Sequence, residues 1–123
     1  MSSSNKNRLL IIVRHSPYGS SLARAGLETA LAAAVFEQPL ELLFMGDGVL
    51  HLIAEQDTST RAVKNSFKLL SSFSLYDIHT IHADDEALAR YGVDVAQLPL
   101  NVTVLDTPAI QQLLAKQDHI LEF

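Results

Sequence analysis

Short apolar runs alternate with amphipathic segments along the whole chain, and this alternation predicts the secondary structure. Each run has only a few residues and carries apolar side chains at consecutive positions. Such a run fits a strand that is covered on both faces, as in a parallel sheet. The five predicted strands occupy Leu9–Val13, Leu40–Met45, Ile78–Ala83, Val102–Leu105 and His119–Phe123.

The segments between these runs have the apolar spacing of three and four that is typical of helices. The face predicted to pack on the sheet in the first helix consists of Ala23, Leu27, Ala30, Leu31, Ala34 and Val35. The other helices are predicted over Arg61–Phe73, from Asp84 or Asp85 to about Tyr91, and from Asp106 or Thr107 to about Lys116, with a short one over Val49–Ala54. Gly92 suits a helix C-terminus and Pro108 a first helical turn.

Strands that alternate with helices predict an α/β fold with one mostly parallel five-stranded sheet and helices on both faces. The chain has 123 residues, which suits one domain. Residues 1–8 are predicted to be a flexible N-terminal tail, and residues 9–123 the α/β domain.

The amino-acid composition argues against several classes of function. The net charge is −5 and only nine residues are Lys or Arg, so no direct nucleic-acid binding is expected. The chain has no cysteine, which excludes disulfides, thiolate metal sites and a cysteine nucleophile. Neither a signal peptide nor a membrane-spanning run is visible, so a cytoplasmic protein without a membrane partner is expected.

In a parallel sheet, ligands bind outside the carboxyl ends of the strands. The predicted loops at that edge place five polar residues around one cleft. The expected cleft-lining residues are His15, Ser16, Asp47, His82 and Asp84.

Arg14-His15, directly after an apolar strand, resembles the start of a histidine phosphatase. Ser16-Pro17 follows, however, where a glycine would let the backbone approach a phosphate closely. Such a site also needs further arginines, and Arg24, Arg61 and Arg90 all fall on predicted helices. A β-α turn with an exposed histidine is favoured, while a small phosphohydrolase or nucleotide-binding domain that uses His15 stays the alternative.

No other motif completes a catalytic or metal site. The chain lacks Gly-x-Gly-x-x-Gly and P-loop sequences, and Gly46-Asp47-Gly48 is most often only a turn. His79 and His82 would point to opposite faces of a strand, while His51 and Glu55 are interpreted as a surface pair. No catalytic residue, metal or cofactor is therefore expected.

One segment is unusually rich in large apolar residues, with six of them in ten positions. A single helix face buries about half of such a set, so the others are candidates for a protein interface. Burial of all six in the core is an equally good explanation. The candidate interface residues are Phe67, Leu70, Phe73, Leu75 and Tyr76.

Four stretches together resemble the DsrE/DsrF-like family, and within it the TusC/DsrF type of subunit. They are HSPYGSSLARAGLETALAAA after the first strand, FMGDGVLHL after the second, FKLLSSFSLYDI before the third and LLAKQDHILEF at the end. They occur in order and span nearly all of residues 9–123, and FKLLSSFSLYDI and the Asp-x-Ile-Leu-x-Phe ending are the most specific.

The resemblance implies an α/β fold and a role in sulfur relay. Subunits of this type join TusB-like and TusD-like subunits in a heterohexamer that relays sulfur as a persulfide. The sulfur goes toward 2-thiouridine synthesis at the tRNA wobble position. In sulfur oxidation, the DsrEFH complex is the counterpart. The accepting cysteine lies after the third strand of the TusD/DsrE-like subunit. The matching region here, Ile81–Asp85, has no thiol, so a non-catalytic structural subunit is expected. Self-association of the isolated chain, with or without a small-molecule ligand, stays open.

Overall fold

The structure, a computed structural model, describes residues 8–18, 21–56, 80–98 and 102–123. Its elements in chain order are β1 (Leu9–Val13), α1 (Leu22–Val35), β2 (Leu40–Phe44), the 3-10 helix η2 (Gly46–Gln56), β3 (Ile81–Asp84), α3 (Asp85–Arg90), the 3-10 turn η4 (Val95–Gln97), β4 (Val102–Leu105), α4 (Thr107–Ala115) and β5 (His119–Glu122). The helix predicted over Arg61–Phe73 lies outside the described residues, as do all five candidate interface residues.

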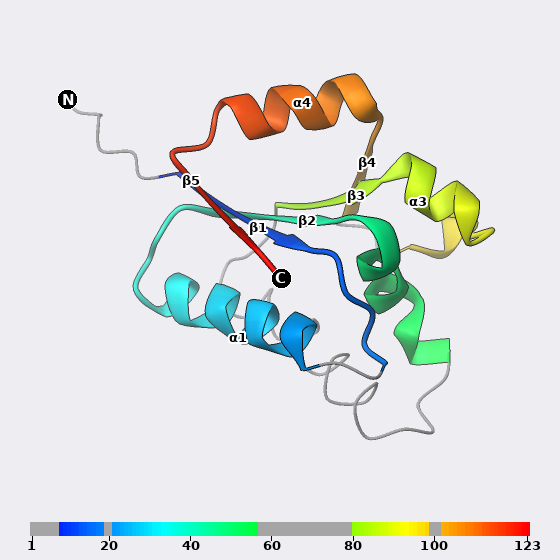
Figure 1. Cartoon of the computed structure of the whole chain (residues 1–123), viewed down its shortest axis with the longest axis horizontal. Coiled ribbons are helices and arrows are strands. Elements are labelled where there is room, and N and C mark those ends of the chain that lie inside the picture. The colour runs from blue at the N-terminus through cyan, green and yellow to red at the C-terminus, as the bar shows by residue number, and fades with distance from the viewer. Residues whose placement is uncertain (1–7, 19–20, 57–79, 99–101) are drawn as a thin grey trace.

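The five strands form one sheet in the order β4-β3-β2-β1-β5, and every neighbouring pair is parallel (Figure 1). This confirms the predicted α/β fold with a five-stranded parallel sheet. The last four residues of β1, Leu10–Val13, are at most 4% exposed, as expected for a strand apolar on both faces. The last strand, β5, forms one edge of the sheet and is exposed along its whole length.

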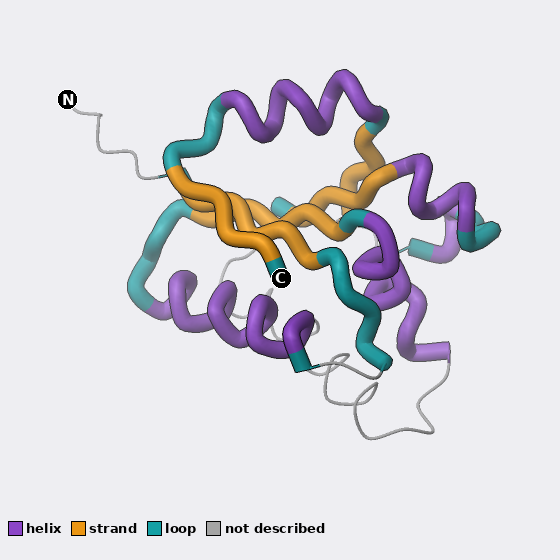
Figure 2. Tube along the Cα trace, viewed as in Figure 1, coloured by secondary structure: helices purple, strands orange, loops and turns teal. Residues whose placement is uncertain are grey.

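The strand order explains how the helices are distributed. The steps from β1 to β2, β3 and β4 all run in one direction across the sheet, so right-handed connections lie on one face. Residues of α1, η2 and α3 pack in one cluster there. The return from β4 to β5 crosses the sheet in the opposite direction and carries α4 to the other face (Figure 2). Helices on both faces are thus confirmed.

Two apolar clusters fill the two faces of the sheet. The larger contains Ile11, Val13, Leu27, Leu42 and Phe44, none of which is exposed. The smaller, under α4, joins Leu10, Ile12, Leu43, Ile110 and Leu113. Successive residues of one strand thus alternate between the two clusters, as the pleat of a strand requires.

Short-range signals place the ends of the helices. Asp84 caps α3 by accepting a hydrogen bond from the Glu86 amide at 3.1 Å. Asp106 caps α4 in the same way, with Pro108 in the first turn. Gly92 follows α3 with a φ of +66°, a conformation that a side chain would strain. Gly92 and Pro108 were predicted at these positions, and Asp84 and Asp106 are each one of the two candidates that the sequence offered for the helix start.

Two expectations, one for α1 and one for the segment after β2, differ from the structure. Val35, predicted on the packed face of α1, is 58% exposed, although its neighbour Ala34 packs against the sheet-facing cluster. At about 3.6 residues per turn, Val35 falls at the margin of the face that Leu27 and Ala30 form. The short helix predicted at Val49–Ala54 begins earlier, since the Gly46–Gly48 turn forms the first turn of η2.

No helix in the described ranges has both the length and the apolar character that a membrane span needs.

Candidate functional site

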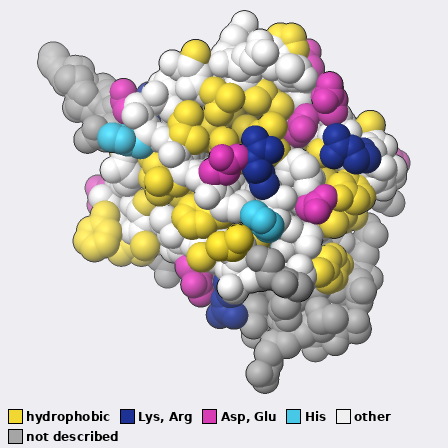
Figure 3. All heavy atoms as spheres, in the orientation of Figure 1, with side chains coloured by type: hydrophobic (Ala, Val, Ile, Leu, Met, Phe, Trp, Pro, Cys, Tyr) yellow, Lys and Arg dark blue, Asp and Glu magenta, His cyan; other side chains and the backbone are white. Residues whose placement is uncertain are grey.

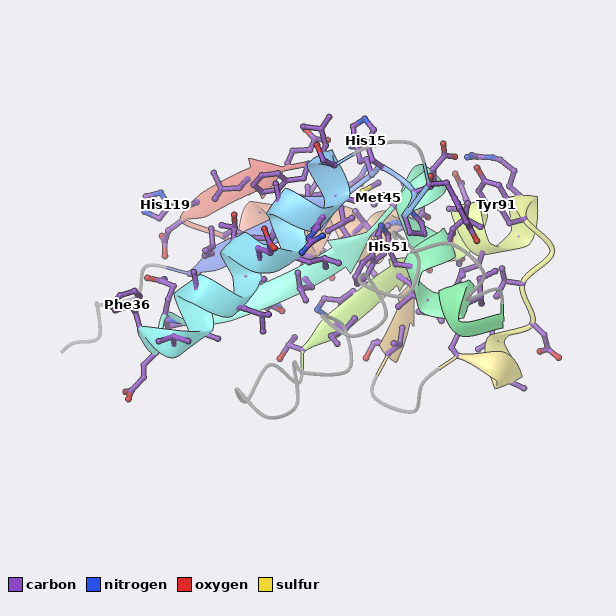
Figure 4. All side chains as sticks on the ribbon, turned by 90° about the horizontal axis from the view of Figure 1, so that it is seen from below. His15, Phe36, Met45, His51, Tyr91 and His119 are labelled. Atoms are coloured by element: carbon purple, nitrogen blue, oxygen red, sulfur yellow. The ribbon has the colours of Figure 1, made fainter. Side chains whose placement is uncertain are left out.

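The carboxyl ends of the strands lie at one end of the molecule. His15, Met45, His51 and Tyr91 are found toward this end in Figure 4, whereas His119 lies toward the opposite end. His15 and Ser16 follow β1, Asp47 follows β2, and Asp84 ends β3. Four of the five predicted site residues are therefore at this carboxyl edge.

The turn after β1 is fixed by bonds to the last residues of the chain and within itself. The Arg14 amide donates to the Phe123 carbonyl at 2.7 Å, and the Arg14 guanidinium forms an ion pair with the Glu122 carboxylate. The Ser16 hydroxyl accepts from the Tyr18 amide at 3.1 Å and lies 3.1 Å from the Tyr18 carbonyl, to which it donates. Ser16 thus closes a turn, and the charge of Arg14 is compensated by Glu122.

His51 lies beneath this turn. It is 2% exposed, and its ring is tilted by 43° against that of Phe44 at a centroid distance of 5.9 Å. Its Nε2 atom lies 2.9 Å from the His15 carbonyl oxygen, which requires that the proton sits on Nε2 and is donated. Burial lowers the pKa of His51 from 6.5 to about 4, although the bond to His15 opposes this shift, so the ring is neutral at physiological pH.

The interpretation of His51 as part of a surface pair was therefore wrong. The residue is buried because η2 lies against the end of β1 at Gly48. A Cβ atom at Gly48 would lie only 1.9 Å from the Val13 carbonyl oxygen, so only glycine permits this approach. The Gly-Asp-Gly triplet was the sequence signal for this close contact. It was interpreted as a turn only, because glycine is the residue type that both a turn and a close backbone contact require.

Asp47 and Asp84 both serve as acceptors of internal hydrogen bonds. The Tyr91 hydroxyl donates to the Asp47 carboxylate, which links η2 to the end of α3 and raises the pKa of Tyr91. Asp84 is 9% exposed and accepts from the Glu86 amide. Neither carboxylate resembles a free general base.

His82 is separated from the other four predicted residues. It lies within β3, opposite Leu43 of β2 and Thr103 of β4, and faces the α4 layer. Its Nε2 atom is 3.1 Å from Glu41 Oε2, and the two side chains are 13% and 15% exposed. The structure therefore pairs His82 with Glu41 and does not bring it beside His15.

Sequence reasoning missed this pair. Glu41 is the only charged residue of β2, and His82 lies on the neighbouring strand, level with Leu43, which is two residues from Glu41 on the same face. A charged residue inside an apolar strand needs a partner when buried. The position of Glu41 in Leu-Glu-Leu-Leu-Phe was the available signal.

The carboxyl edge offers little for covalent or phosphate chemistry. The chain has no cysteine, and within the described ranges no three His, Asp or Glu side chains gather as metal ligands would. The cation nearest to His15 in sequence, Arg14, is paired with Glu122, and Arg24 is paired with Glu28 on α1. The described residues therefore give no support to the phosphohydrolase alternative. The surface shown in Figure 3 mixes charges of both signs with apolar side chains.

Comparisons with known proteins agree with this architecture. A family model described as the DsrE/DsrF-like family matches residues 7–123. A protein named TusC homolog from Vibrio vulnificus is 31% identical over 117 residues, which covers 95% of this chain and 99% of that protein. A TusC homolog from Pseudomonas aeruginosa is 31% identical over 113 residues, which covers 92% and 95% of the two chains.

Solved structures show the same fold. The crystal structure of the ychN protein from E. coli superposes with a TM-score of 0.81 at 20% identity and covers 95% of this chain and 99% of its own. A conserved protein of unknown function from Bacteroides thetaiotaomicron gives a TM-score of 0.64 at 18% identity, with 95% and 96% covered. Together with the sequence matches, these findings show that the chain belongs to the DsrE/DsrF-like family, as one of its TusC-type members.

Proposed function

We propose that this protein is a non-catalytic structural subunit of a cytoplasmic, TusBCD/DsrEFH-like heterohexameric sulfur-relay complex. The observation that carries this proposal is the absence of a thiol at the end of β3. The resemblance implies that the sulfur-accepting cysteine of the carrier subunit follows the third strand. The matching region of this chain, Ile81–Asp85, has no thiol: β3 ends there at Asp84, which caps α3, and the chain contains no cysteine at any position.

The chemistry of persulfide transfer explains why this matters. An accepting thiolate attacks the outer sulfur of a donor persulfide and takes it up, while the donor leaves as a thiolate. Asp84 offers no sulfur atom, and its carboxylate is largely buried and hydrogen-bonded to the Glu86 amide. A chain of this kind takes part in the relay only by supporting a subunit that has the thiol.

The loops of the carboxyl edge suit a supporting role. Arg14, Ser16 and Asp47 are all engaged in bonds within the chain. Such bonds hold the loops in a fixed shape before a partner arrives, which lowers the ordering cost of association. We propose TusB-like and TusD-like subunits as the partners.

Co-expression with the TusB-like and TusD-like chains of the same organism tests the proposal. Native mass spectrometry is expected to find two copies of each chain in one complex. After incubation with a persulfide donor, the mass gain of one sulfur atom is expected only on the TusD-like chain. Separate elution of the three chains would refute the structural role, and a sulfur adduct on this chain would refute its non-catalytic character.

The candidate interface from Phe67 to Tyr76 lies outside the described residues and stays a prediction. Phe73→Asp is expected to release the chain from the complex while the isolated chain keeps its circular dichroism spectrum. The matched control is Phe36→Asp, because Phe36 is 84% exposed after α1. Unfolding of the isolated Phe73→Asp chain would assign this segment to the core instead.

The pathway is tested separately in the host. Loss of this chain is expected to remove 2-thiouridine from the wobble position, which gels containing an organomercurial detect as loss of tRNA retardation. Unchanged tRNA together with impaired sulfur oxidation would assign the complex to the DsrEFH pathway.

A further inference from the structure

A pocket of about 440 Å³ lies at the amino ends of the strands, opposite to the carboxyl edge. Leu9 and Leu40, the first residues of β1 and β2, form part of its wall. Leu9 is level with His119, which marks this end of the molecule in Figure 4. The volume falls within the roughly 300–1,000 Å³ that is typical of small-molecule sites.

Arg8 is held in the wall of this pocket by its backbone. Its amide donates to Asp118 Oδ2 at 2.8 Å, and its carbonyl accepts from the Asp118 and His119 amides, both at 2.9 Å. One guanidinium nitrogen donates to Glu41 Oε1 at 3.0 Å. The side chain is 42% exposed, and its other N–H donors have no partner among the described residues. Arg8 therefore offers a fork of donors that matches a carboxylate.

Glu41 supplies the opposite charge in the same wall. Its carboxylate accepts from Arg8 and Gln117 on Oε1 and lies beside His82 on Oε2. Burial alone would raise its pKa, but the bonds from Gln117, His82 and Arg8 hold the pKa of Glu41 below its ordinary value, so it is ionised at neutral pH. Oε2 has one hydrogen-bond partner among the described residues, His82, so by its lone pairs it can accept from one further donor.

Gln117 points to a missing donor close by. Its amide nitrogen donates to Glu41 Oε1 at 2.8 Å and to the Leu113 carbonyl at 3.2 Å. Its Oε1 atom is buried and has no hydrogen-bond partner in the described part of the chain. Buried acceptors without partners are rare and call for an explanation. A ligand that brings N–H donors beside Glu41 would provide one.

The charges in this pocket select the class of ligand. A simple anion that approached Arg8 would also meet Glu41, and a simple cation would also meet Arg8. A zwitterion satisfies both at once. We propose that the pocket binds a free α-amino acid with an apolar side chain, its carboxylate toward Arg8, its ammonium toward Glu41, and its side chain along the part of the wall beside Pro39, where β1 and β2 begin.

Isothermal titration of the full-length protein with L-leucine tests this proposal. Two analogues test the two charged groups of leucine separately, since 4-methylpentanoate lacks the amine and 3-methylbutylamine lacks the carboxylate. Each is expected to bind at least about tenfold more weakly than leucine, because each loses one charge-assisted contact. Equal binding of all three compounds would show a merely apolar pocket and overturn the proposal, as would no binding of leucine at millimolar concentration.

Variants locate the site. Arg8→Ala is expected to weaken leucine binding at least about tenfold, and Arg8→Lys to recover only part of the loss, because lysine keeps the charge without the fork. Arg24→Ala is the matched control, since Arg24 is an exposed arginine paired with Glu28 on α1. Circular dichroism verifies that each variant is folded. Unchanged affinity in folded Arg8→Ala would refute the assignment, whatever the outcome of the sulfur-relay experiments.

Discussion

Acidification is expected to destabilise the protein through one buried side chain, His51. The ring is 2% exposed, contacts Phe44 and donates its Nε2 proton to the His15 carbonyl. A second proton on this ring would place a positive charge in an apolar environment. Burial is accordingly the main reason that the pKa of His51 falls from 6.5 to about 4.

The sign and size of the effect follow from proton linkage. Between the folded-state pKa of about 4 and the unfolded value of 6.5, the unfolded chain binds more protons at His51 than the folded chain does. Stability is therefore fully present above 6.5 and is lost as the pH falls toward 4. Over the whole window the loss is about 3 kcal/mol, and from about pH 7.5 to about pH 5 it is about 2 kcal/mol.

Urea unfolding followed by circular dichroism measures this loss. The free energy of unfolding is determined across the pH window for the wild type and for His51→Gln, whose amide still offers a donor to the His15 carbonyl but does not titrate. The difference between the two proteins isolates His51 from other titrating groups. His119→Gln is the control, because His119 is exposed on β5. If His51→Gln retained the full pH dependence of the wild type, the assignment to His51 would be wrong.

Two further predictions concern stability. Gly48→Ala is expected to cost about 1–3 kcal/mol of folding stability, because the new Cβ would lie 1.9 Å from the Val13 carbonyl oxygen. Gly92→Ala is expected to cost less, because Gly92 has open space around it and only a strained φ of +66°. Equal urea midpoints for the two variants would contradict the close contact at Gly48. Glu41→Ala is expected to cost about 1–3 kcal/mol because it leaves the half-buried side chains of Gln117 and His82 without their shared acceptor. The control Glu28→Ala removes an exposed helix pair and is expected to cost at most about 0.5 kcal/mol. Thermal unfolding measures both variants, and a similar loss in the two would contradict the bonding role of Glu41.

Local sequence signals were sufficient for most of the framework. Leu9–Val13 is apolar on both faces and forms an interior strand of the sheet. Asp84, Asp106 and Gly92 occupy helix ends, as their side chains or backbone freedom suggest. Helix capping and strand patterning depend on only a few neighbouring residues, so both can be predicted from short stretches of the sequence. The edge at which the strand-end loops meet also followed from parallel topology alone.

The partners of the site residues could not be predicted in the same way. Arg14 pairs with a residue 108 positions away, and Tyr91 bonds to Asp47 across 44 positions. Such pairs depend on the order of the strands, which alternation of strands and helices does not specify. The burial of His51 likewise depends on how closely η2 approaches β1. The sequence signal for this contact is a single glycine, Gly48, which nothing distinguishes from the other glycines of the chain.

The two ends of the sheet use their polar residues in opposite ways. At the carboxyl edge, where parallel α/β proteins ordinarily hold ligands, Arg14, Asp47 and Asp84 are spent on bonds within the chain. At the amino edge, Arg8 retains unpaired donors and Gln117 an unpaired acceptor, both counted among the described residues. Among the described residues, the polar side chains named at the carboxyl edge are thus paired within the chain, whereas the amino edge keeps donors and an acceptor without partners. This contrast is the reason that we propose the ligand pocket at the amino edge.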